Sequence, residues 1–542
     1  MTNSDQRTRR RVGVFGWGVV APRSPDIASF LKNLQSSESW LTPFDGFGPC
    51  NYLVGKPEFD FEDYHPWLDE RFPPSRYHQL TSKMGQPTLY AIGSFIQSLT
   101  QNPGIEKDLQ DLGEQAHVYV GTGLGDLPSI AEIAIGYDKA QRKWNRFWAH
   151  PERNRTLAAF LAGDTRAEHG ISEHSDSPPD PQEFTDEDDH EEAVQAWNDY
   201  WMRLSPQLGE YLAELREIES DDVSGDVESG KAALLRRKMT KIAELRSQWG
   251  VPTEPWSSVS ANLLWNIHST PAAQISMLGR ITGSTFAPVA ACSTFGFTLR
   301  LAMDAIDRGD AKAVVIGAAD PAPHPLTVGT FSSARVLASD GRLSKPLTGL
   351  RGTHASGGSC IWILGDLEYF QAKGYRPLGL EPLGVGVSSD AGHIITPSSA
   401  GPLSAIDQAF TRAGATPEQV GTWDLHATAT PGDYLEVENA RKVLPAETII
   451  SARKGTFGHG MGVSGGWELL AQYLAYEHGS IHPTSLENSE LNPEIAKVHY
   501  NFVENEAMPL PEGLAGKLSM GVGGLNACVI SRRWDKSGNA GS

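Results

Sequence analysis

Short apolar runs, most of them followed by turn residues or a segment of helical periodicity, recur along the whole chain. Residues 11–22 read as a short buried strand followed by a glycine-rich turn, and residues 116–124 read as a strand that ends in glycines. Residues 313–320, 359–364 and 377–388 are further apolar runs of strand length. This rhythm predicts an α/β fold with mostly parallel sheets covered by helices.

One of these runs leads to a cysteine. Phe286 to Val289 precede Ala290-Ala291-Cys292-Ser293-Thr294, and apolar residues then recur at three- and four-residue spacings as on one face of a helix. At such a strand-to-helix turn, unpaired amides and the helix dipole should lower the pKa of the Cys292 thiol and prepare it to form a thioester. A lone cysteine among small residues can equally be a small buried hydrophobe.

Three further constellations lie in the second half, each at the predicted end of a strand. His426-Ala427-Thr428-Ala429-Thr430-Pro431 is the first, and Lys454-Gly455-Thr456-Phe457-Gly458-His459 is the second. The third is the glycine-rich tail Gly521-Val522-Gly523-Gly524-Leu525-Asn526. Each motif alone has a structural explanation, as a strand-end histidine, a loop lysine or a glycine turn. Together with Cys292 they combine a thiol, two imidazoles, an ammonium group and exposed amides.

The composition of the chain changes upstream of all four motifs. Residues 166–192 contain eleven Asp or Glu and one basic residue, Arg166, and should form a solvated, mobile loop. Helical patterns flank this loop at residues 130–148, 193–218 and 230–249. We therefore expect a helical insertion at about residues 131–255, either a structural cap or oligomer contact or a docking element. The acids at 186–189 could suggest a metal site, but a solvated charge run is the simpler interpretation.

Charge and cysteine content exclude several classes of protein. The formal net charge of −20 argues against a nucleic-acid partner, and an acidic carrier protein would have to dock on a local basic patch. The four cysteines, at 50, 292, 360 and 528, lack metal-type spacing and are too few for a disulfide framework, which indicates a reducing, cytoplasmic location. No run of about twenty apolar residues is present, so we expect no membrane span.

Taken jointly, the motifs resemble those of the β-ketoacyl-ACP synthases, the thiolase-fold condensing enzymes of fatty-acid and polyketide synthesis. The resemblance rests on Cys292 in Ala-Cys-Ser-Thr, His426 in His-x-Thr-x-Thr-Pro, Lys454 and His459 in Lys-x-x-x-Gly-His, and the Gly-x-Gly-Gly-x-Asn tail. The two-histidine set is typical of the Cys-His-His type. The resemblance to the family covers about residues 11–534, except for the insertion.

The resemblance implies a fold and a domain organisation. The expected fold is a thiolase-like five-layer αβαβα sandwich of two similar halves. Residues 1–373 would form the N-terminal half with the nucleophile, interrupted by the insertion at 131–255. Residues 374–542 would form the C-terminal half with His426, Lys454 and His459.

The resemblance also implies the chemistry. Cys292 would accept an acyl group, with the oxyanion held by the amides of Cys292 and Val522. His426 and His459 would stabilise the enolate formed when a malonyl thioester loses carbon dioxide, and Lys454 would orient the site. Thr428 and Asn526 would lie next to the reacting groups and hold them in position without taking part in the reaction. No metal and no organic cofactor is implied.

Partners follow from the same resemblance. They are acyl- and malonyl-loaded carrier protein or acyl-coenzyme A, and a second subunit in a homodimer or in a heterodimer with a related chain. Val522 stands where the family has a phenylalanine that gates the acyl tunnel, so acyl selection should differ. The alternative function is a non-catalytic partner subunit, a chain-length factor or scaffold for another synthase. Cys528 we interpret as a packing residue within an apolar strand.

Overall fold

The structure is a computed structural model that describes residues 9–163, 177–222, 227–394, 398–499 and 501–534. The chain divides into two compact units. The first combines Met1–Ser129 with Leu264–Ser542, and the second is Ile130–Leu263.

The first unit contains two five-stranded sheets, of which the first has the order β1-β7-β6-β4-β5. Its strands are β1 (Val12–Val20), β7 (Gly358–Asp366), β6 (Ala313–Asp320), β4 (Ala116–Gly121) and β5 (Thr285–Phe286). The β1–β7 and β7–β6 pairs are antiparallel, whereas β6–β4 and β4–β5 are parallel.

The second sheet repeats this pattern. Read as β8-β14-β13-β9-β10, its first two pairs are antiparallel and its last two are parallel. The strands are β8 (Leu380–Ser389), β14 (Leu525–Arg533), β13 (Leu514–Gly521), β9 (Val420–Asp424) and β10 (Ile449–Ser451). The expectation of mostly parallel sheets is therefore wrong: half of the pairings in the two described sheets are antiparallel. In the second sheet the reason is the tight β13–β14 hairpin, whose turn returns the chain directly alongside β13.

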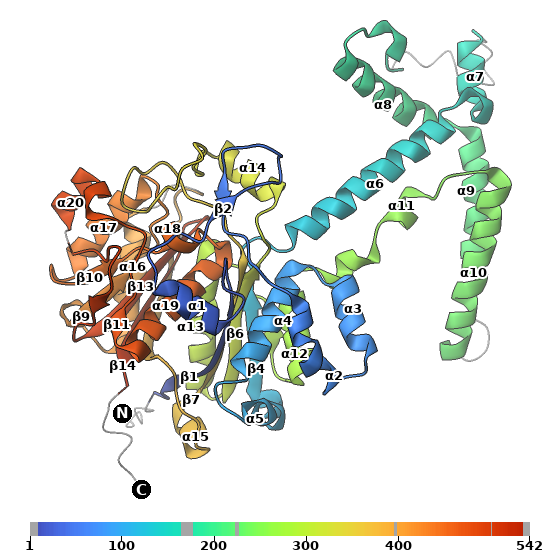
Figure 1. Cartoon of the computed structure of the whole chain (residues 1–542). Coiled ribbons are helices and arrows are strands. Elements are labelled where there is room, and N and C mark those ends of the chain that lie inside the picture. The colour runs from blue at the N-terminus through green and yellow to red at the C-terminus, as the bar shows by residue number, and fades with distance from the viewer. Residues whose placement is uncertain (1–8, 164–176, 223–226, 395–397, 500, 535–542) are drawn as a thin grey trace, which may run out of the picture. The chain divides into compact units, whose positions relative to one another are not determined.

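Helices cover both faces of both sheets in this unit (Figure 1). Helices α13 and α19 contact each other and strands of both sheets, so they form the middle layer, while α4 and α12 cover the first sheet and α16 covers the second. The bounds are α4 (Gln86–Ser98), α12 (Thr270–Gly279), α13 (Thr294–Arg308), α16 (Ala400–Ala413), α17 (Gly432–Val443) and α19 (Ser464–His478). The five-layer αβαβα architecture expected from the sequence is confirmed.

The glycines in the middle and second half of β1 allow close packing. A Cβ atom on Gly16 would lie 2.0 Å from the Ser98 carbonyl oxygen, and one on Gly18 would lie 1.8 Å from that of Ser94. These glycines let α4 approach the strand. The predicted glycine-rich turn after a short strand is thus wrong, because β1 continues to Val20.

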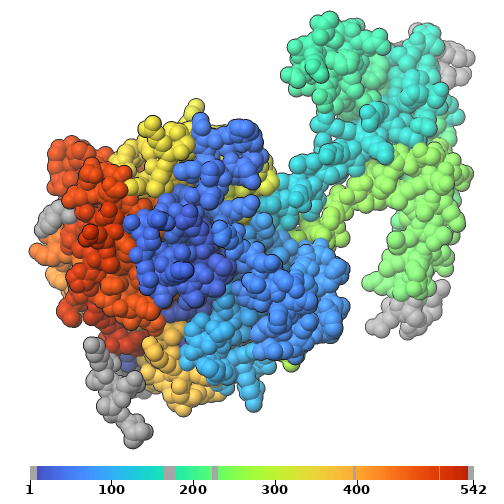
Figure 2. All heavy atoms as spheres, viewed as in Figure 1, coloured from blue at the N-terminus to red at the C-terminus, as the bar shows by residue number. Residues whose placement is uncertain are grey.

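Large apolar side chains of both halves share one core between the sheets. Phe295 of α13 packs edge-on against Trp362 of β7, with ring centroids 5.1 Å apart, and Trp362 lies 4.9 Å from Tyr473 of α19. Trp467 of α19 is also fully buried in this cluster. Figure 2 shows the amino-terminal and carboxyl-terminal parts of the unit side by side on one face, in agreement with the contact of α1 with α19.

The remaining described elements of this unit are short. They are α1 (Ile27–Leu34), β2 (Thr42–Pro43), β3 (Leu53–Val54), α2 (His65–Asp69), α3 (Ser75–Lys83), α5 (Ile105–Asp111), α14 (Pro325–Ser333), α15 (Leu367–Ala372), α18 (Lys454–Phe457), β11 (Ser480–Ile481), α20 (Pro493–Val498) and β12 (Met508–Pro509).

The described part of the second unit is helical. Its helices are α6 (Leu127–Trp148), which begins in the first unit, α7 (Arg155–Leu161), α8 (Glu187–Arg203), α9 (Pro206–Glu219), α10 (Val227–Trp249) and α11 (Pro255–Ser258). Trp144, Trp148 and Tyr211 form the centre of its main apolar cluster.

Two sequence expectations concern this unit in detail. The helical pattern of residues 193–218 is not one helix, because Ser205 caps a new helix that has Pro206 in its first turn. The acids at 186–189 are exposed and stand at the start of α8, where Asp186 accepts hydrogen bonds from the amides of Asp188 and Asp189. Their interpretation as a solvated run is confirmed. The predicted mobile loop lies partly outside the described residues.

None of the helices in the described ranges has both the length and the apolar character needed to cross a membrane.

Candidate active site

Cys292 lies on a tight turn between the two sheets. Ala291 has φ of 47°, which is unusual for a residue with a side chain, and a 3₁₀ turn (Ala291–Ser293) leads directly into α13. Ser293 donates to the Leu525 carbonyl oxygen at 2.7 Å, which ties this turn to the start of β14. Cys292 is 8% exposed, so it is a buried residue.

The predicted lowering of the Cys292 pKa is wrong. Burial raises the pKa of this thiol to about 11, and hydrogen bonds from the Val522 and Cys292 amides and the charge of Lys454 reduce that rise without reversing it. The desolvation of a fully enclosed thiolate outweighs the positive end of the helix. The thiol is consequently protonated at neutral pH.

His459 lies on a second turn that repeats the geometry of the first. Met461 has φ of 54°, and a 3₁₀ turn (Met461–Val463) leads into α19, as the turn of Cys292 leads into α13. His459 Nδ1 lies 2.8 Å from Ser464 Oγ and accepts a hydrogen bond from the Met461 amide at 3.3 Å. The backbone holds this imidazole in place from behind.

His426 follows the end of β9. Its amide and that of Ala427 donate to the two carboxylate oxygens of Glu436 on α17, at 2.7 and 2.8 Å. Glu436 therefore fixes the loop that carries the imidazole. The side chain of His426 is buried, as is that of His459.

Lys454 stands at the first position of α18 and is 2% exposed. Its Nζ atom donates to the His426 carbonyl oxygen at 2.5 Å, lies 3.4 Å from His426 Nδ1 and pairs with Glu468 Oε1 at 2.5 Å. A buried ammonium group needs such a counter-charge. Lys454 thus contacts one of the two imidazoles directly.

The structure brings the thiol and both imidazoles together. One ligand-type atom each of Cys292, His426 and His459 lies within 4.8 Å of the others. The imidazole rings meet edge to face, with centroids 5.4 Å apart and an interplanar angle of 83°. Residues separated by up to 167 positions in the sequence therefore form one cluster.

Hydrogen bonds determine the tautomers of the imidazoles. The Lys454 ammonium can only donate to His426 Nδ1, and the Met461 amide can only donate to His459 Nδ1. The proton of each neutral ring is therefore on Nε2. Within the described part of the chain this cluster is the group of side chains that could hold a metal ion, but protonated Nε2 atoms suit hydrogen-bond donation better.

Both imidazoles are neutral at physiological pH. Burial, and then the charge of Lys454, lower the pKa of His426 well below its usual value. The same two causes act in the same order on the pKa of His459. The site therefore offers two neutral donors.

Val522 lies in the turn between β13 and β14. Gly523 and Gly524 have φ of 89° and 71°, which glycine tolerates best, and the Val522 amide points towards the thiol of Cys292. Val522 is 42% exposed.

Thr428 and Asn526 do not contact the cluster through any hydrogen bond of the described residues. Thr428 Oγ1 lies 2.9 Å from Thr430 Oγ1, and its amide donates to Asp433 at 2.8 Å. Asn526 Nδ2 donates to Asp390 Oδ1 at 2.7 Å and to the Gly524 carbonyl oxygen at 3.0 Å, so it braces the turn of Val522.

Sequence reasoning missed the buried charges behind the cluster. Glu468 and Lys517 are both almost fully buried, and Lys517 Nζ lies 2.8 Å from Glu468 Oε2 and 3.7 Å from Asp424 Oδ1. The available signal was a single charge inside an apolar run, as in Trp467-Glu468-Leu469. A charge in such a run is retained only where it finds a partner.

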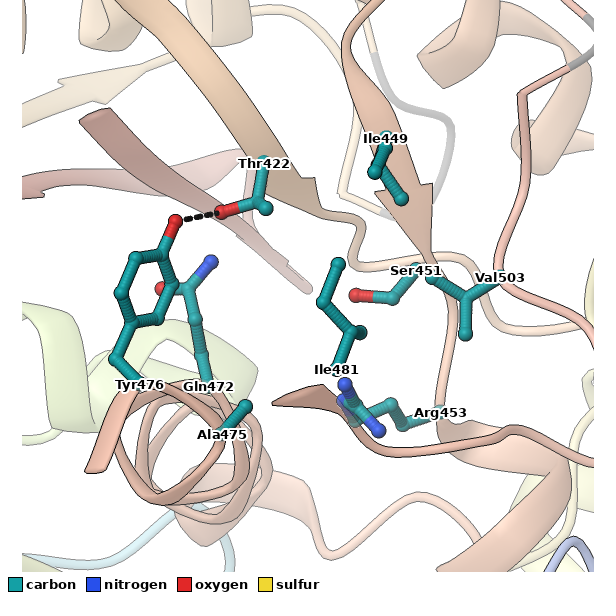
Figure 3. Close-up of a pocket in the computed structure, with 9 residues that line it drawn as sticks. All are labelled: Thr422, Ile449, Ser451, Arg453, Gln472, Ala475, Tyr476, Ile481 and Val503. Carbon is teal, nitrogen blue, oxygen red and sulfur yellow. Dashed lines mark hydrogen bonds between the residues drawn. The ribbon is translucent and has the colours of Figure 1, made fainter. Parts of the chain in front are cut away.

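A pocket lies beside the buried charged group of Glu468, Lys517 and Asp424. Figure 3 shows its lining residues, which include Ser451 and Arg453 but neither the cysteine nor the imidazoles of the cluster. Ser451 donates to Asp424 Oδ2 at 2.6 Å, and Arg453 donates to the same atom at 3.2 Å. This pocket is a neighbour of the site and not the site itself.

Comparison with known proteins gives a consistent result. The profile described as "Beta-ketoacyl synthase, N-terminal domain" matches residues 238–363, and "Beta-ketoacyl synthase, C-terminal domain" matches residues 381–486. The chain is 30% identical over 260 residues to the 3-oxoacyl-acyl-carrier-protein synthase I of barley (Hordeum vulgare), an alignment that covers 46% of this chain and 55% of the barley protein. The chain spans about half the length of the first curated relatives it matches.

Solved structures agree on the fold. The ishigamide ketosynthase/chain length factor superposes with a TM-score of 0.67 at 19% identity, over 97% of this chain and all of that chain. The complex of a type II polyketide synthase acyl carrier protein with its ketosynthase, AntDE:AntF, gives a TM-score of 0.62 at 17% identity with the same coverage. At these identities the likeness concerns the fold alone.

Proposed function

Because the chain belongs to the β-ketoacyl synthase family, we propose that it catalyses the decarboxylative Claisen condensation of an acyl thioester with malonyl-ACP. The products are a β-ketoacyl-ACP and carbon dioxide, in fatty-acid or polyketide-type biosynthesis. The observation that carries the proposal is the cluster of Cys292, His426 and His459 within 4.8 Å, with Lys454 against His426.

The first step loads the cysteine. Cys292 Sγ attacks the thioester carbonyl, and the resulting oxyanion accepts hydrogen bonds from the Cys292 and Val522 amides, which already point at the sulfur. The carrier or coenzyme A leaves as a thiol and takes up the proton that Sγ loses. Because the thiol is protonated in the empty site, this proton moves only when the substrate is bound.

The second step forms the carbon–carbon bond. The malonyl thioester loses carbon dioxide, and the electron pair of the broken bond becomes an enolate whose oxygen accepts hydrogen bonds from Nε2–H of His426 and His459. The enolate carbon attacks the acyl carbonyl on Cys292, the C–S bond breaks with its electron pair left on sulfur, and the thiolate then takes a proton from water. Neutral imidazoles with the proton on Nε2 are the form that this step requires.

We assign supporting roles to three more residues. Lys454 holds the His426 loop and neutralises charge that develops at the site. Asn526 braces the turn whose Val522 amide serves the oxyanion. Thr428 stabilises the loop after His426 through Thr430 and Asp433.

We also propose the domain division expected from the sequence. Residues 1–373 are the N-terminal half, residues 374–542 are the C-terminal half, and a helical insertion occupies about residues 131–255. The repetition of sheet order supports two halves. The compact helical unit Ile130–Leu263 supports the insertion.

The acyl donor is a carrier protein or coenzyme A, and the assembly is a homodimer or a heterodimer with a related subunit. Strand β5 supports a dimer: it is an edge strand, and Phe286 and the nearby Val289 are 40% and 54% exposed. We place the protein in the cytoplasm, because all four cysteines are free thiols and the reaction needs a reduced Cys292.

The test of function is acyl loading followed by condensation. Incubation with acyl-ACP or acyl-coenzyme A should add the acyl mass to Cys292, as seen by peptide mass spectrometry, and the loaded protein should then release carbon dioxide from malonyl-ACP. His426→Ala should still load Cys292 but release carbon dioxide at least about 100-fold more slowly.

Cys292→Ala is the control and should carry no adduct. Absence of an adduct in the wild-type protein would refute the catalytic proposal. That result would favour a non-catalytic partner subunit, a chain-length factor or scaffold.

A further inference from the structure

A second lysine lies behind the reacting groups, and neither the sequence motifs nor the mechanism above uses it. Lys517 stands on β13, the central strand of the second sheet, and its side chain is 1% exposed. Its neighbours along the strand, Ala515, Gly516 and Leu518, are apolar or small. Burying an ammonium group is costly, so its retention requires strong partners.

Lys517 and Lys454 share one carboxylate. Glu468 Oε1 lies 2.5 Å from Lys454 Nζ, and Glu468 Oε2 lies 2.8 Å from Lys517 Nζ. Glu468 would otherwise have one free oxygen and could rotate away from Lys454. The second ammonium group therefore restricts the position of the first.

The two lysines also hold adjacent carbonyl groups. Lys517 donates to the Leu425 carbonyl oxygen at 3.2 Å, and Lys454 donates to that of His426, the next residue. Lys517 additionally donates to its neighbour Leu518. Two ammonium groups thus hydrogen-bond to the backbone of the segment that carries the His426 imidazole.

From these contacts we propose that Lys517 is a positioning residue of the condensation step. Through Glu468 and the Leu425 carbonyl oxygen it fixes the positions of the Lys454 and His426 side chains relative to each other. The inference rests on the proposed function and deepens it. Lys517 contacts neither Cys292 nor the imidazoles through any hydrogen bond of the described residues, so its effect is indirect.

Its charge acts on the same site. Burial lowers the pKa of Lys517, but the carboxylates of Glu468 and Asp424 outweigh burial and raise it above its usual value, so the group is charged. The charge of Lys517 contributes, after burial and Lys454, to the lowered pKa of both His426 and His459. Loss of this charge would make both imidazoles easier to protonate.

Other charged groups face the imidazoles from each packed element. Lys454 of α18 acts in the same direction as Lys517, and Cys292 on the nucleophile turn is neutral. The acids are Glu436 of α17, whose pKa burial raises to about 8, Glu468 of α19, and Asp424 of β9, which accepts hydrogen bonds from Ser451 and Arg453. Without Lys517, these acids would be balanced by one positive charge fewer.

The experiment compares Lys517→Met and Lys517→Gln with Lys517→Arg, which keeps the charge. We measure acyl loading of Cys292, kcat for condensation, and the dependence of kcat on pH from 5 to 8. Both neutral variants should load Cys292 within a few-fold of wild type and lose roughly 10- to 100-fold in kcat at pH 7.5, because misplacement of a reacting group is costly. The acid limb of their pH profile should move to higher pH, and Lys517→Arg should restore most of the kcat and the acid limb.

The outcomes separate this inference from the proposed function. A wild-type protein that neither loads nor condenses would refute the function. An active wild type with neutral variants of unchanged kcat and acid limb would refute only the role of Lys517. The role would also be refuted if both neutral variants failed to fold while Lys517→Arg folded with a wild-type profile, since Lys517 would then be a structural residue.

Discussion

Burial decides the protonation of the reacting residues more than their local sequence does. Cys292 stands near a helix start, yet enclosure raises its pKa to about 11, and enclosure likewise lowers the pKa of both imidazoles. The result is a site whose thiol and imidazoles are all neutral before substrate binds. In the proposed mechanism, the thiol therefore loses its proton only when the substrate is bound.

The neutral imidazoles predict an acid-sensitive fold. The pKa of His426 in the folded protein is well below the value of about 6.5 in an unfolded chain, so below that pH the unfolded state binds a proton that the folded state does not. This group favours the folded state fully at high pH and loses that contribution as the pH falls below about 6.5. Between pH 7.5 and 5.5 the loss is about 1.4 kcal/mol.

The measurement is chemical denaturation of wild type and His426→Gln at these two pH values. Wild type should lose about 1.4 kcal/mol more of its free energy of unfolding on acidification than the variant. The other buried histidines, such as His354 and His482, affect both proteins equally. An equal loss in the two proteins would show that His426 is not held neutral.

At the scale of elements, two 3₁₀ turns followed by long helices carry the site. The turn of Cys292 and the turn after His459 both begin with a residue of positive φ and both feed a helix of the middle layer. Asp320, at the end of β6, connects the second turn to the first sheet by accepting from the Gly462 and Gly123 amides at 2.8 and 2.9 Å. These turns are packed too closely for added side chains.

Gly462→Ala tests this packing. The new Cβ would lie 2.6 Å from the Gly123 amide nitrogen and 2.9 Å from Asp320 Oδ2, so backbone must move. We expect a loss of about 1–3 kcal/mol in the free energy of unfolding and a lower kcat for condensation. Thermal and chemical denaturation give the first value, and carbon dioxide release gives the second.

Gly136→Ala is the matched control. Gly136 lies within α6, is exposed, and has no atom within 4 Å of an added Cβ. Alanine should stabilise that helix by about 0.5–1 kcal/mol and leave kcat unchanged. A Gly462→Ala protein as stable and active as wild type would contradict the close packing described here.

At the scale of the whole molecule, each five-stranded sheet has two edge strands, β1 and β5 in the first sheet and β8 and β10 in the second. Edge strand β5 is short and has exposed apolar side chains beside it, and we propose that a second subunit covers it. The double substitution Phe286→Asp and Val289→Asp should convert the dimer into a monomer, because it places four charges in a symmetric interface. Light scattering coupled to size exclusion gives the mass.

A control substitution tests whether placing a charge at any exposed apolar residue changes the mass. Met239 on α10 is 70% exposed and lies in the other unit, so Met239→Asp should leave the mass unchanged. A dimer that survives the β5 substitutions would place the interface elsewhere. A monomeric wild-type protein would contradict the dimer altogether.

The sequence by itself predicted the class of fold and the residues that the structure brings together. Cys292, His426, Lys454 and His459 stand in short motifs whose resemblance to a known family pointed to them, and strands and helices show their periodicity locally. The expectation of mostly parallel sheets was wrong, because it overlooked the β13–β14 hairpin and because the other three antiparallel pairs join strands that lie far apart in the sequence.

Only the tertiary structure decided the electrostatics of the site. The pKa of Cys292 rises because several elements enclose it, and a sequence-local argument about a helix end cannot include that burial. Glu468 and Lys517 meet although 49 positions separate them, and each looks in isolation like a misplaced charge in an apolar run. Motifs are local in the chain, whereas desolvation and ion pairing depend on everything that packs around a group.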